Sequence, residues 1–555
     1  MKSLLIIIIT FCFSIYISAQ EQNHYLVVYF KGKDETPYTI EKPSDFLTKR
    51  AIERREKYNI PIDFSDLPVV PNYLELLLSK KIALKIFYTS RWMNLAVVKP
   101  HSDWKLNINQ IWIKEVKEYG IISKSKTKSY DENMQPVFPH IYDTITNPYL
   151  NQIKLDKLHR MGFTGKGIRI AVFDAGFSYM QRHRIFDPLF NENRVIATKD
   201  FVSFSDNIYT YHSHGMHVTA LLAANAPDRY VGSAPDAEYI LIRIDDINTE
   251  SIIEEYNWLA AAEYADSLGV DVINASLGFI DFDDAEDYKT TDLNGRTAIS
   301  SISAGMAAAK GIAVIVSAGN EGENGFWSRY ITFPADNPDV IAVGSVNESG
   351  ERSAFSSLGP RSSICEYIKP DLLARGENVY VPSPSPTSDL GEFLETKGGT
   401  SYSAPLIAGG IACLLQNFPN KTPKEIVTAL KQSGSNSFDP DRFIGWGIPD
   451  FYFAYRDLNK LKPEFENDNI KINYIVHQPF NQTIEINLTS INNCILTVNI
   501  YDTLGRLLYV QQYKILYDRM EYISIDVQFT VKPEIVILTI QDEKNILIKR
   551  KILIL

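Results

Sequence analysis

The chain has 555 residues, of which 45% are hydrophobic and 22% charged, so it is long enough for several folded domains and has the composition of a globular protein. Its formal net charge of −11 argues against a nucleic-acid-binding protein, because such proteins usually carry a strongly basic surface. The four cysteines are Cys12, Cys365, Cys413 and Cys494. They form no CxxC motif and no Cys/His cluster, so they indicate neither a zinc site nor a thiol redox site.

The N-terminus has the order of a secretory signal peptide. Lys2 precedes an apolar run over residues 4–17, and the small residues Ser18 and Ala19 follow. A membrane anchor is the alternative, but the run is shorter than the roughly 20 residues that cross a bilayer. We predict a signal peptide over residues 1–19, and we expect a protein that is secreted or at the cell surface.

Residues 20–120 combine short alternating runs, such as YLVVYF, ALKIFY and MNLAVV, with a charged helical stretch over residues 45–58. This pattern predicts a small α+β domain. Glu53 and Glu56 interrupt the basic residues of the stretch at helical spacing, which favours a solvated helix face over a nucleic-acid site. The basic residues are Lys49, Arg50, Arg54, Arg55 and Lys57.

Residues 150–460 alternate β-branched runs with alanine-rich helical stretches. The runs IRIAVF, YILIRI, VDVINAS and IAVIVSA are separated by stretches such as IEEYNWLAAAEYADSLG and AISSISAGMAAAKG. This alternation predicts an α/β domain, a mainly parallel sheet with helices on both faces. Ligands of such sheets bind at the carboxyl ends of the strands.

Two segments flank this central region. Residues 121–149 are polar and interrupted by prolines, which predicts an exposed linker with a processing site. Residues 461–555 carry period-two runs such as TIEINL without a comparable helical stretch, which predicts a small all-β sandwich.

Three motifs in the central region carry polar side chains where strands end or helices begin. Asp174 ends the run IRIAVF, His214 opens the helical stretch HGMHVTALLAANA, and Ser401 opens SYSAPLIAGGIACLL. Each alone has an ordinary structural explanation, as a turn former, a surface histidine or a helix cap. Together they supply a hydroxyl nucleophile, an imidazole base and a carboxylate that orients the base, in the chain order Asp, His, Ser that subtilisin uses.

Asn320 adds a fourth group to this chemistry. It follows the run IAVIVSA in the motif SAGNEG, so its carboxamide lies at another strand end. The tetrahedral oxyanion of acyl transfer needs hydrogen-bond donors, and removal of one costs roughly 10²–10³ in rate. We predict that Asn320 and the backbone N–H of Ser401 form an oxyanion hole.

With these motifs the sequence resembles the subtilisin-like serine peptidases, or subtilases (peptidase S8). Met216 stands where the family usually has Thr, and Tyr402 stands where it usually has Met. The matching text is FDAGF around Asp174, HGMHV around His214, GSAPDAEYILIRI over residues 232–244, VINASLG ending at Gly278, SAGNEG around Asn320, FPADNPDVIAVGSV from Phe333, AFSSLGP from Ala354, KPDLLARGENV from Lys369 and GTSYSAP around Ser401.

The resemblance also assigns roles to the flanking domains. Residues 20–120 resemble a pro-domain of a bacterial branch of the family, which implies an intramolecular inhibitor that is later removed. Residues 461–555, with VNIYDTLGRLLYV, are similar to the type IX secretion sorting domain of that branch, which implies secretion machinery as a partner. A degenerate sorting domain or a purely structural cap is the alternative, because Lys532-Pro533-Glu534 replaces the usual glycine-aromatic motif.

By the same resemblance, Ser276, Leu277 and Gly278 form an edge on which substrate backbone pairs as an added strand. No cofactor is required. A structural calcium site is one interpretation of the oxygen-rich loop with Asp281, Asp283, Asp284, Glu286 and Asp287. The spacing of these residues matches no known motif, which favours a solvated loop.

The sequence therefore predicts an exported, monomeric serine endopeptidase that acts on protein or peptide substrates through an acyl-enzyme. Two alternatives stay open at this stage. A catalytically silent binding or scaffold protein would fit the departures at Met216 and Tyr402. An esterase with the same triad is disfavoured, because no GxSxG motif surrounds Ser401.

Overall fold

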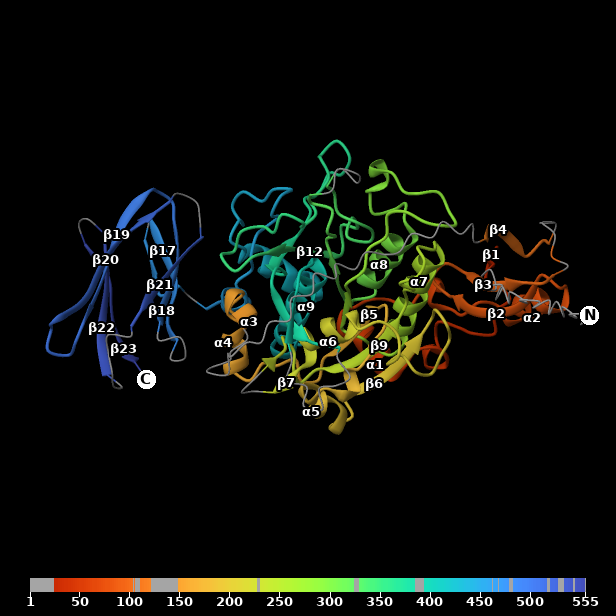
Figure 1. The fold of residues 1–555 in the computed structure, drawn as a ribbon, viewed down its shortest axis with the longest axis horizontal. Helices are drawn as coiled ribbons and strands as arrows, with labels where there is room; N and C mark the ends of the chain where they lie inside the picture. Colours follow the sequence, from red (N-terminus) through yellow and green to blue (C-terminus); the bar gives the residue numbers. More distant parts are fainter. Residues whose placement is uncertain are drawn as a thin grey trace, which may run out of the picture.

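A computed structural model describes residues 24–102, 104, 110–120, 148–226, 230–323, 329–384, 394–461, 463–467, 469–478, 483–516, 520–527, 534–542 and 545–554. The predicted signal peptide and residues 121–147 of the predicted linker lie outside these ranges. Within them, no helix is both long enough and apolar enough to cross a membrane. Figure 1 shows three units in a row, with the N-terminal and C-terminal units at opposite ends of the central one.

The N-terminal domain is a four-stranded antiparallel sheet in the order β2-β3-β1-β4, with two short helices. One face of the sheet, with Leu26, Val28 and Val98, packs with Leu77 of α2. The opposite face, with Val27 and Val97, belongs to the core of the central domain. The elements are β1 (Tyr25–Phe30), α1 (Lys49–Lys57), α2 (Pro71–Ser79), β2 (Ala83–Ser90), β3 (Leu95–Pro100) and β4 (Ile113–Tyr119).

Helix α1 is shorter than the predicted helix over residues 45–58. It begins at residue 49, because the side chain of Thr48 accepts a hydrogen bond from Ala51 N and caps the helix. The prediction of a solvated face is wrong for Arg54 and Arg55, which are 3% and 1% exposed. Both guanidinium groups contact the carboxylate of Asp266 in the central domain. Burial of these cations is possible because the tertiary fold supplies an anion that lies far away in the sequence.

The central domain contains the predicted parallel sheet, with seven strands in the order β13-β12-β11-β10-β5-β9-β6. Alternate residues of each strand point to opposite faces, so that Ile170 and Val172 pack in one core and Ala171 and Phe173 in the other. The strands are β5 (Arg169–Asp174), β6 (Val195–Asp200), β9 (Glu238–Arg243), β10 (Val272–Ala275), β11 (Ala313–Ser317), β12 (Ile341–Val346) and β13 (Leu372–Arg375).

Helices cover both faces of this sheet. The core with Ile170 contains residues of α6 (His214–Ala223) and α9 (Thr400–Asn417), and the core with Ala171 contains residues of α7 (Ile253–Ser267) and α8 (Ile299–Ala309). The smaller elements are α3 (Pro148–Gln152), α4 (Leu155–Arg160), α5 (Asp187–Asn191), β7 (Asn225–Ala226), β8 (Tyr230–Val231), β14 (Val379–Pro382), β15 (Leu394–Lys397), α10 (Pro423–Gln432) and α11 (Phe451–Leu458).

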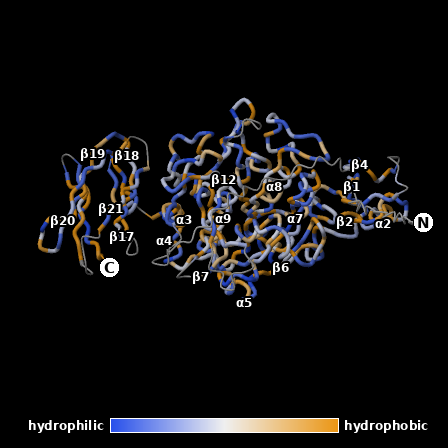
Figure 2. Tube along the Cα trace, in the orientation of Figure 1, coloured by the Kyte–Doolittle hydropathy of each residue, from blue (hydrophilic) through white to orange (hydrophobic). Residues whose placement is uncertain are grey.

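The C-terminal unit consists of two four-stranded sheets, ordered β16-β17-β18-β21 and β20-β19-β22-β23. Their inner faces share one core, to which Ile472 and Ile486 contribute from one sheet and Val498 and Leu538 from the other. Hydrophobic segments accordingly run along these strands in Figure 2. The strands are β16 (Phe465–Glu466), β17 (Ile470–Gln478), β18 (Thr483–Ser490), β19 (Cys494–Tyr501), β20 (Leu507–Ile515), β21 (Met520–Asp526), β22 (Glu534–Gln541) and β23 (Ile546–Ile554).

The C-terminal unit is docked on the central domain by buried polar contacts. Lys157 of α4 donates to Glu485 of β18 at 2.8 Å, and its ammonium lies 4.4 Å from the centre of the Tyr474 ring. The hydroxyl of Tyr474 donates to Asp450 at 2.5 Å. Because Lys157 is only 5% exposed, these contacts replace its hydration and hold the two units together.

Candidate active site

The carboxyl ends of the central strands are level with one another. Ala275 of β10 pairs with Phe173 of β5 on one side and with Val316 of β11 on the other. The residues at the ends of these strands and just beyond them, including Asp174, Ser276 and Asn320, therefore gather at one edge of the sheet.

Asp174 and His214 form a buried hydrogen-bonded pair at this edge. His214 Nδ1 lies 2.8 Å from Asp174 Oδ1 and 3.0 Å from Oδ2. Asp174 Oδ1 also accepts from the N–H of Ala175 at 2.8 Å, which fixes the carboxylate in place. Asp174 is 0% and His214 5% exposed, so the carboxylate faces the imidazole in a site that excludes most water. This arrangement sets the Nδ1–H tautomer and leaves Nε2 as the basic nitrogen.

A close approach of the backbone brings these two residues together. The N–H of Gly215 donates to the carbonyl of Gly176 at 3.0 Å, which joins the first turn of α6 to the turn after β5. A Cβ on Gly215 would lie only 2.3 Å from that carbonyl oxygen and 2.9 Å from the ring of Phe177. Glycine is therefore required beside His214 for α6 to begin at this point.

Asn320 is oriented by Thr400, the first residue of α9. The backbone N–H and the hydroxyl of Thr400 both donate to Asn320 Oδ1, at 2.9 and 3.0 Å. The same hydroxyl accepts from the N–H of Gly319 at 3.1 Å. Since the carboxamide oxygen is held toward Thr400, the amide nitrogen faces the other way.

The amide nitrogen of Asn320 and the hydroxyl of Ser401 face one small region. The point that a Cβ on Gly399 would occupy lies 3.5 Å from Asn320 Nδ2 and 3.6 Å from Ser401 Oγ. Gly399 has φ +150° and carries no Cβ, so no side chain of residue 399 lies between these two groups. A hydroxyl and an N–H donor that converge in this way can bind a carbonyl carbon and its oxygen, respectively.

The predicted substrate-binding edge is joined to the start of α9. Asn274 Nδ2 donates to Ser276 Oγ at 3.0 Å, and Ser276 Oγ donates to the carbonyl of Ser401 at 2.9 Å. Ser276 is buried and Leu277 is 7% exposed, whereas the backbone at Gly278 is exposed. The edge is thereby held at a fixed distance from the Ser401 hydroxyl.

Tyr402 is a constituent of the site whose role the motif analysis missed. Its ring centre lies 5.7 Å from that of His214 and 6.5 Å from that of His217, so the ring is flanked by two imidazoles from successive turns of α6. Burial lowers the pKa of His217 well below its usual value, and the charge of His214 lowers it further. His217 is therefore neutral at pH 7 and does not repel a protonated His214. The only sequence signal was the departure from the family's usual Met.

Two carboxylates of the acidic loop over residues 281–287 accept hydrogen bonds from the segment before α7. Asp283 Oδ2 accepts from the N–H of Glu250 at 3.1 Å, and Asp284 accepts from the hydroxyl of Ser251 at 2.6 Å and the N–H of Ile252 at 2.9 Å. Across the described residues, no group of three or more His, Cys, Asp or Glu side chains could hold a metal ion. A structural calcium site in this loop stays a prediction. Cys365, Cys413 and Cys494 are all free thiols.

Comparisons with known proteins match an N-terminal and a central part of the chain separately. A model of the subtilase family, peptidase S8, matches residues 165–447, and a model of the Bacteroidota peptidase S8 propeptide domain matches residues 25–134. Subtilisin NAT of Bacillus subtilis subsp. natto is 32% identical over 298 residues, which are 52% of this chain and 68% of the relative. The subtilisin of Bacillus pumilus is 31% identical over 292 residues, 52% of this chain and 91% of the relative.

Among solved structures, the MycP3 protease of the type VII (ESX-3) secretion system is similar over 58% of this chain and 91% of its own, with 22% identity and a TM-score of 0.44. The family match and the subtilisin identities establish the class of this protein. The chain belongs to the subtilase family and is a serine-type endopeptidase with an N-terminal propeptide domain.

Proposed function

We propose that Ser401 is the nucleophile of this peptidase, with His214 as its general base and Asp174 as the carboxylate that orients His214. The observation that carries the proposal is the buried pair of His214 Nδ1 and Asp174 Oδ1, 2.8 Å apart, at the strand ends beside the start of α9. A hydroxyl becomes a useful nucleophile only when a neighbouring base takes its proton, and the carboxylate stabilises the imidazolium that forms.

In the proposed reaction, His214 Nε2 takes the proton of Ser401 Oγ as that oxygen bonds to the peptide carbonyl carbon. The negative charge moves to the carbonyl oxygen, where Asn320 Nδ2 and the backbone N–H of Ser401 donate hydrogen bonds. His214 then gives its proton to the departing amine, the C–N bond breaks, and an acyl-enzyme remains. Water releases the acyl group by the same steps, again with His214 as base. The proposed reaction uses these side chains, the backbone N–H of Ser401 and water, and it needs no cofactor.

Substrate backbone is proposed to pair along Ser276, Leu277 and Gly278. The exposed backbone at Gly278 offers hydrogen-bonding groups to an extended peptide, and the contact between Ser276 Oγ and the carbonyl of Ser401 fixes this edge relative to the nucleophile. Such pairing recognises main-chain groups, so it accepts protein and peptide substrates of varied sequence.

We further propose that the protein is made as an exported precursor. Residues 1–19 act as the signal peptide, and the propeptide domain inhibits the peptidase until the chain is cut within residues 121–149. Subtilisin relatives and the propeptide match support such a precursor. The all-β C-terminal unit is proposed to act as a sorting domain read by secretion machinery, and the active form is proposed to be a monomer.

Processing of a full-length chain tests the assignment of Ser401. The wild-type chain is expected to lose its N-terminal domain and to cleave a denatured protein substrate. The Ser401→Ala chain is expected to remain uncut and inactive. An exposed serine of the same domain, changed as Ser362→Ala, is the matched control and should behave as wild type. Normal processing and activity of Ser401→Ala would contradict the proposal and favour a catalytically silent role for this site.

A further inference from the structure

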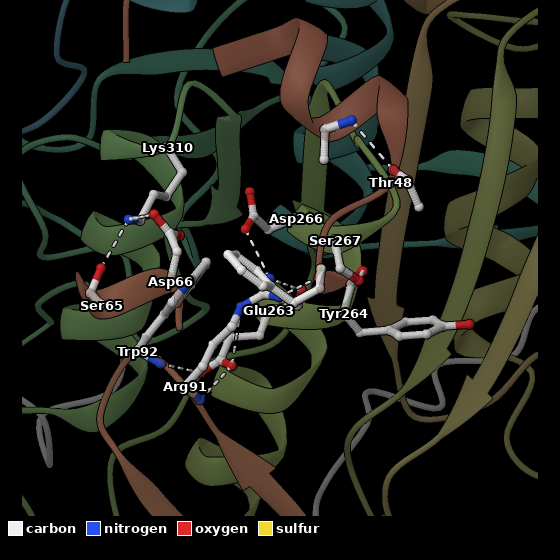
Figure 3. Close-up of polar contacts among 12 residues, drawn as sticks. Thr48, Ser65, Asp66, Arg91, Trp92, Glu263, Tyr264, Asp266, Ser267 and Lys310 are labelled. Atoms are coloured by element: carbon white, nitrogen blue, oxygen red, sulfur yellow. Dashed lines mark hydrogen bonds and ion pairs between the residues drawn. The ribbon is translucent and has the colours of Figure 1, made fainter. Parts of the chain in front are cut away.

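Three arginines of the propeptide domain converge on one carboxylate of the central domain. Arg55 Nη2 lies 2.9 Å from both oxygens of Asp266, Arg91 Nη2 lies 3.0 Å from Oδ2, and Arg54 contacts Oδ1. Asp266 is 0% exposed. Figure 3 shows Asp266 and Arg91 at the centre of this polar contact. The anion has exchanged its hydration for cations that all come from the propeptide domain.

The neighbouring charges are paired across the same boundary. Glu263 accepts from the backbone N–H groups of Arg91 and Trp92, at 2.9 and 3.1 Å, and from the hydroxyl of Ser90. In the opposite direction, Lys310 of the central domain donates to Asp66 of the propeptide domain at 3.0 Å. Glu263, Asp266 and Lys310 of the central domain are thus each paired with a group of the propeptide domain.

Helix α1 also lies against the carboxyl-terminal ends of α7 and α8. The N–H of Thr48 donates to the carbonyl of Ser267 at 3.1 Å, and Arg50 Nε donates to that of Gly269 at 3.0 Å. Arg54 donates to the carbonyls of Val270 and, at 3.3 Å, Lys310. Carbonyls at helix carboxyl ends lack intrahelical partners and carry partial negative charge, so cationic donors are favoured there.

The backbone leaves little space between the two domains here. A Cβ on Gly269, which has φ +73°, would lie 2.7 Å from Cγ of Arg50. A Cβ on Gly311, which has φ +85°, would lie 2.8 Å from Cδ1 of Ile60. We call the ends of α7 and α8, together with Glu263, Asp266, Asp271 and Lys310, the helix-end site.

The propeptide sheet makes a second, apolar contact with the central domain, in which Val27, Trp92 and Val97 share a core with residues of α7. An apolar contact tolerates many partners of similar shape. A contact that buries a charge tolerates fewer partners. A partner without the opposite charge leaves the buried charge unpaired, and this weakens binding.

We propose that the helix-end site lets the peptidase domain select its own propeptide domain and retain it after the chain between the two domains has been cut. The partner that this site fits is a helix that carries arginines at the spacing found in α1. The inference rests on the proposed processing of the precursor, but its test does not require catalysis.

The test uses the full-length Ser401→Ala chain with a recognition sequence for a site-specific protease inserted between residues 121 and 147. After the cut, dilution and size-exclusion chromatography measure how tightly the N-terminal fragment stays bound. The parent chain should retain the fragment. Arg55→Met removes the guanidinium that contacts both oxygens of Asp266, and it should weaken retention by at least about 100-fold.

Lys49→Met is the matched control, because it removes an equal charge from the same helix at a side chain that is 90% exposed. It should change retention by less than about threefold. Retention of the Arg55→Met fragment as in the parent, or equal losses for Lys49→Met and Arg55→Met, would overturn the proposal.

A second variant covers the case in which Arg55→Met does not fold. Arg50 lies at the margin of the site, with a partly exposed guanidinium 2.6 Å from Asp271. Arg50→Met should keep the fold and weaken retention by about tenfold, less than Arg55→Met and more than Lys49→Met. A retention equal to that of the parent would also overturn the proposal. Since every chain carries Ser401→Ala, these outcomes are independent of whether Ser401 is the nucleophile.

Discussion

Replacement of Asp174 by asparagine tests the physical basis of the proposed catalysis. The change keeps the shape of the side chain but removes the charge that faces His214 across 2.8 Å. With an effective dielectric constant of about 20, two unit charges at that separation attract each other by about 6 kcal/mol. If the imidazolium forms in the transition state, the loss of this attraction corresponds to about 10⁴-fold in kcat.

The assay is hydrolysis of a chromogenic peptide anilide by chains from which residues 24–120 have been cut away and separated. Asp174→Asn should lower kcat by about 10⁴-fold with little change in KM, because the carboxylate acts on the transition state. Asp187→Asn removes an exposed carboxylate from the same domain and is the control. A loss in kcat of less than tenfold, in an Asp174→Asn protein with an unchanged Tm, would refute the reasoning.

Two further predictions concern the surroundings of the site, and a third concerns a buried acid of α7. Thr400→Val removes a hydroxyl donor to Asn320 Oδ1 and should lower kcat about tenfold, whereas Asn320→Ala should lower kcat by about 10²–10³-fold. Equal kcat values for Thr400→Val and wild type would contradict the positioning role of Thr400. Tyr402→Met removes the ring that lies 5.7 Å from the His214 ring, so kcat should fall about threefold, whereas Tyr402→Phe keeps the ring and should leave kcat unchanged. Equal kcat values for the two variants would contradict this packing role. Burial raises the pKa of Glu255 from 4.5 to about 7, so the folded state favours the protonated acid. The folded state therefore loses up to about 3 kcal/mol of stability as the pH rises from 4.5 through 7. Glu255→Gln should raise Tm relative to wild type more at pH 8 than at pH 5, and a pH-independent difference in Tm would count against this.

Strong local periodicity made much of the fold predictable. The runs IRIAVF and IAVIVSA became β5 and β11, and the alanine-rich stretches between the strands became α7 and α8. The placement of Asp174 and Asn320 at one sheet edge followed from a topological rule, since parallel strands end on the same side. The position of Asp174 and Asn320 at this edge could therefore be predicted from motifs and strand order, and their catalytic roles stay proposals.

Features that depend on contacts between distant segments were not predictable. Arg54 and Arg55 have the spacing of a solvated helix face, and their burial depends on Asp266, which is 212 and 211 residues away in the chain. The role of Thr400 depends on where the Asn320 carboxamide turns, and that of Tyr402 depends on how α9 packs on α6. Local sequence patterns carry no information on such pairings.

Labelling with a fluorophosphonate probe tests the central claim most directly. The probe forms a covalent bond only with a serine whose hydroxyl is activated by a base. After removal of the N-terminal domain, the wild-type protein should carry one probe group, located by mass spectrometry on the peptide that contains Ser401, and Ser401→Ala should carry none. An unlabelled wild-type protein, or equal labelling of Ser401→Ala, would contradict the account.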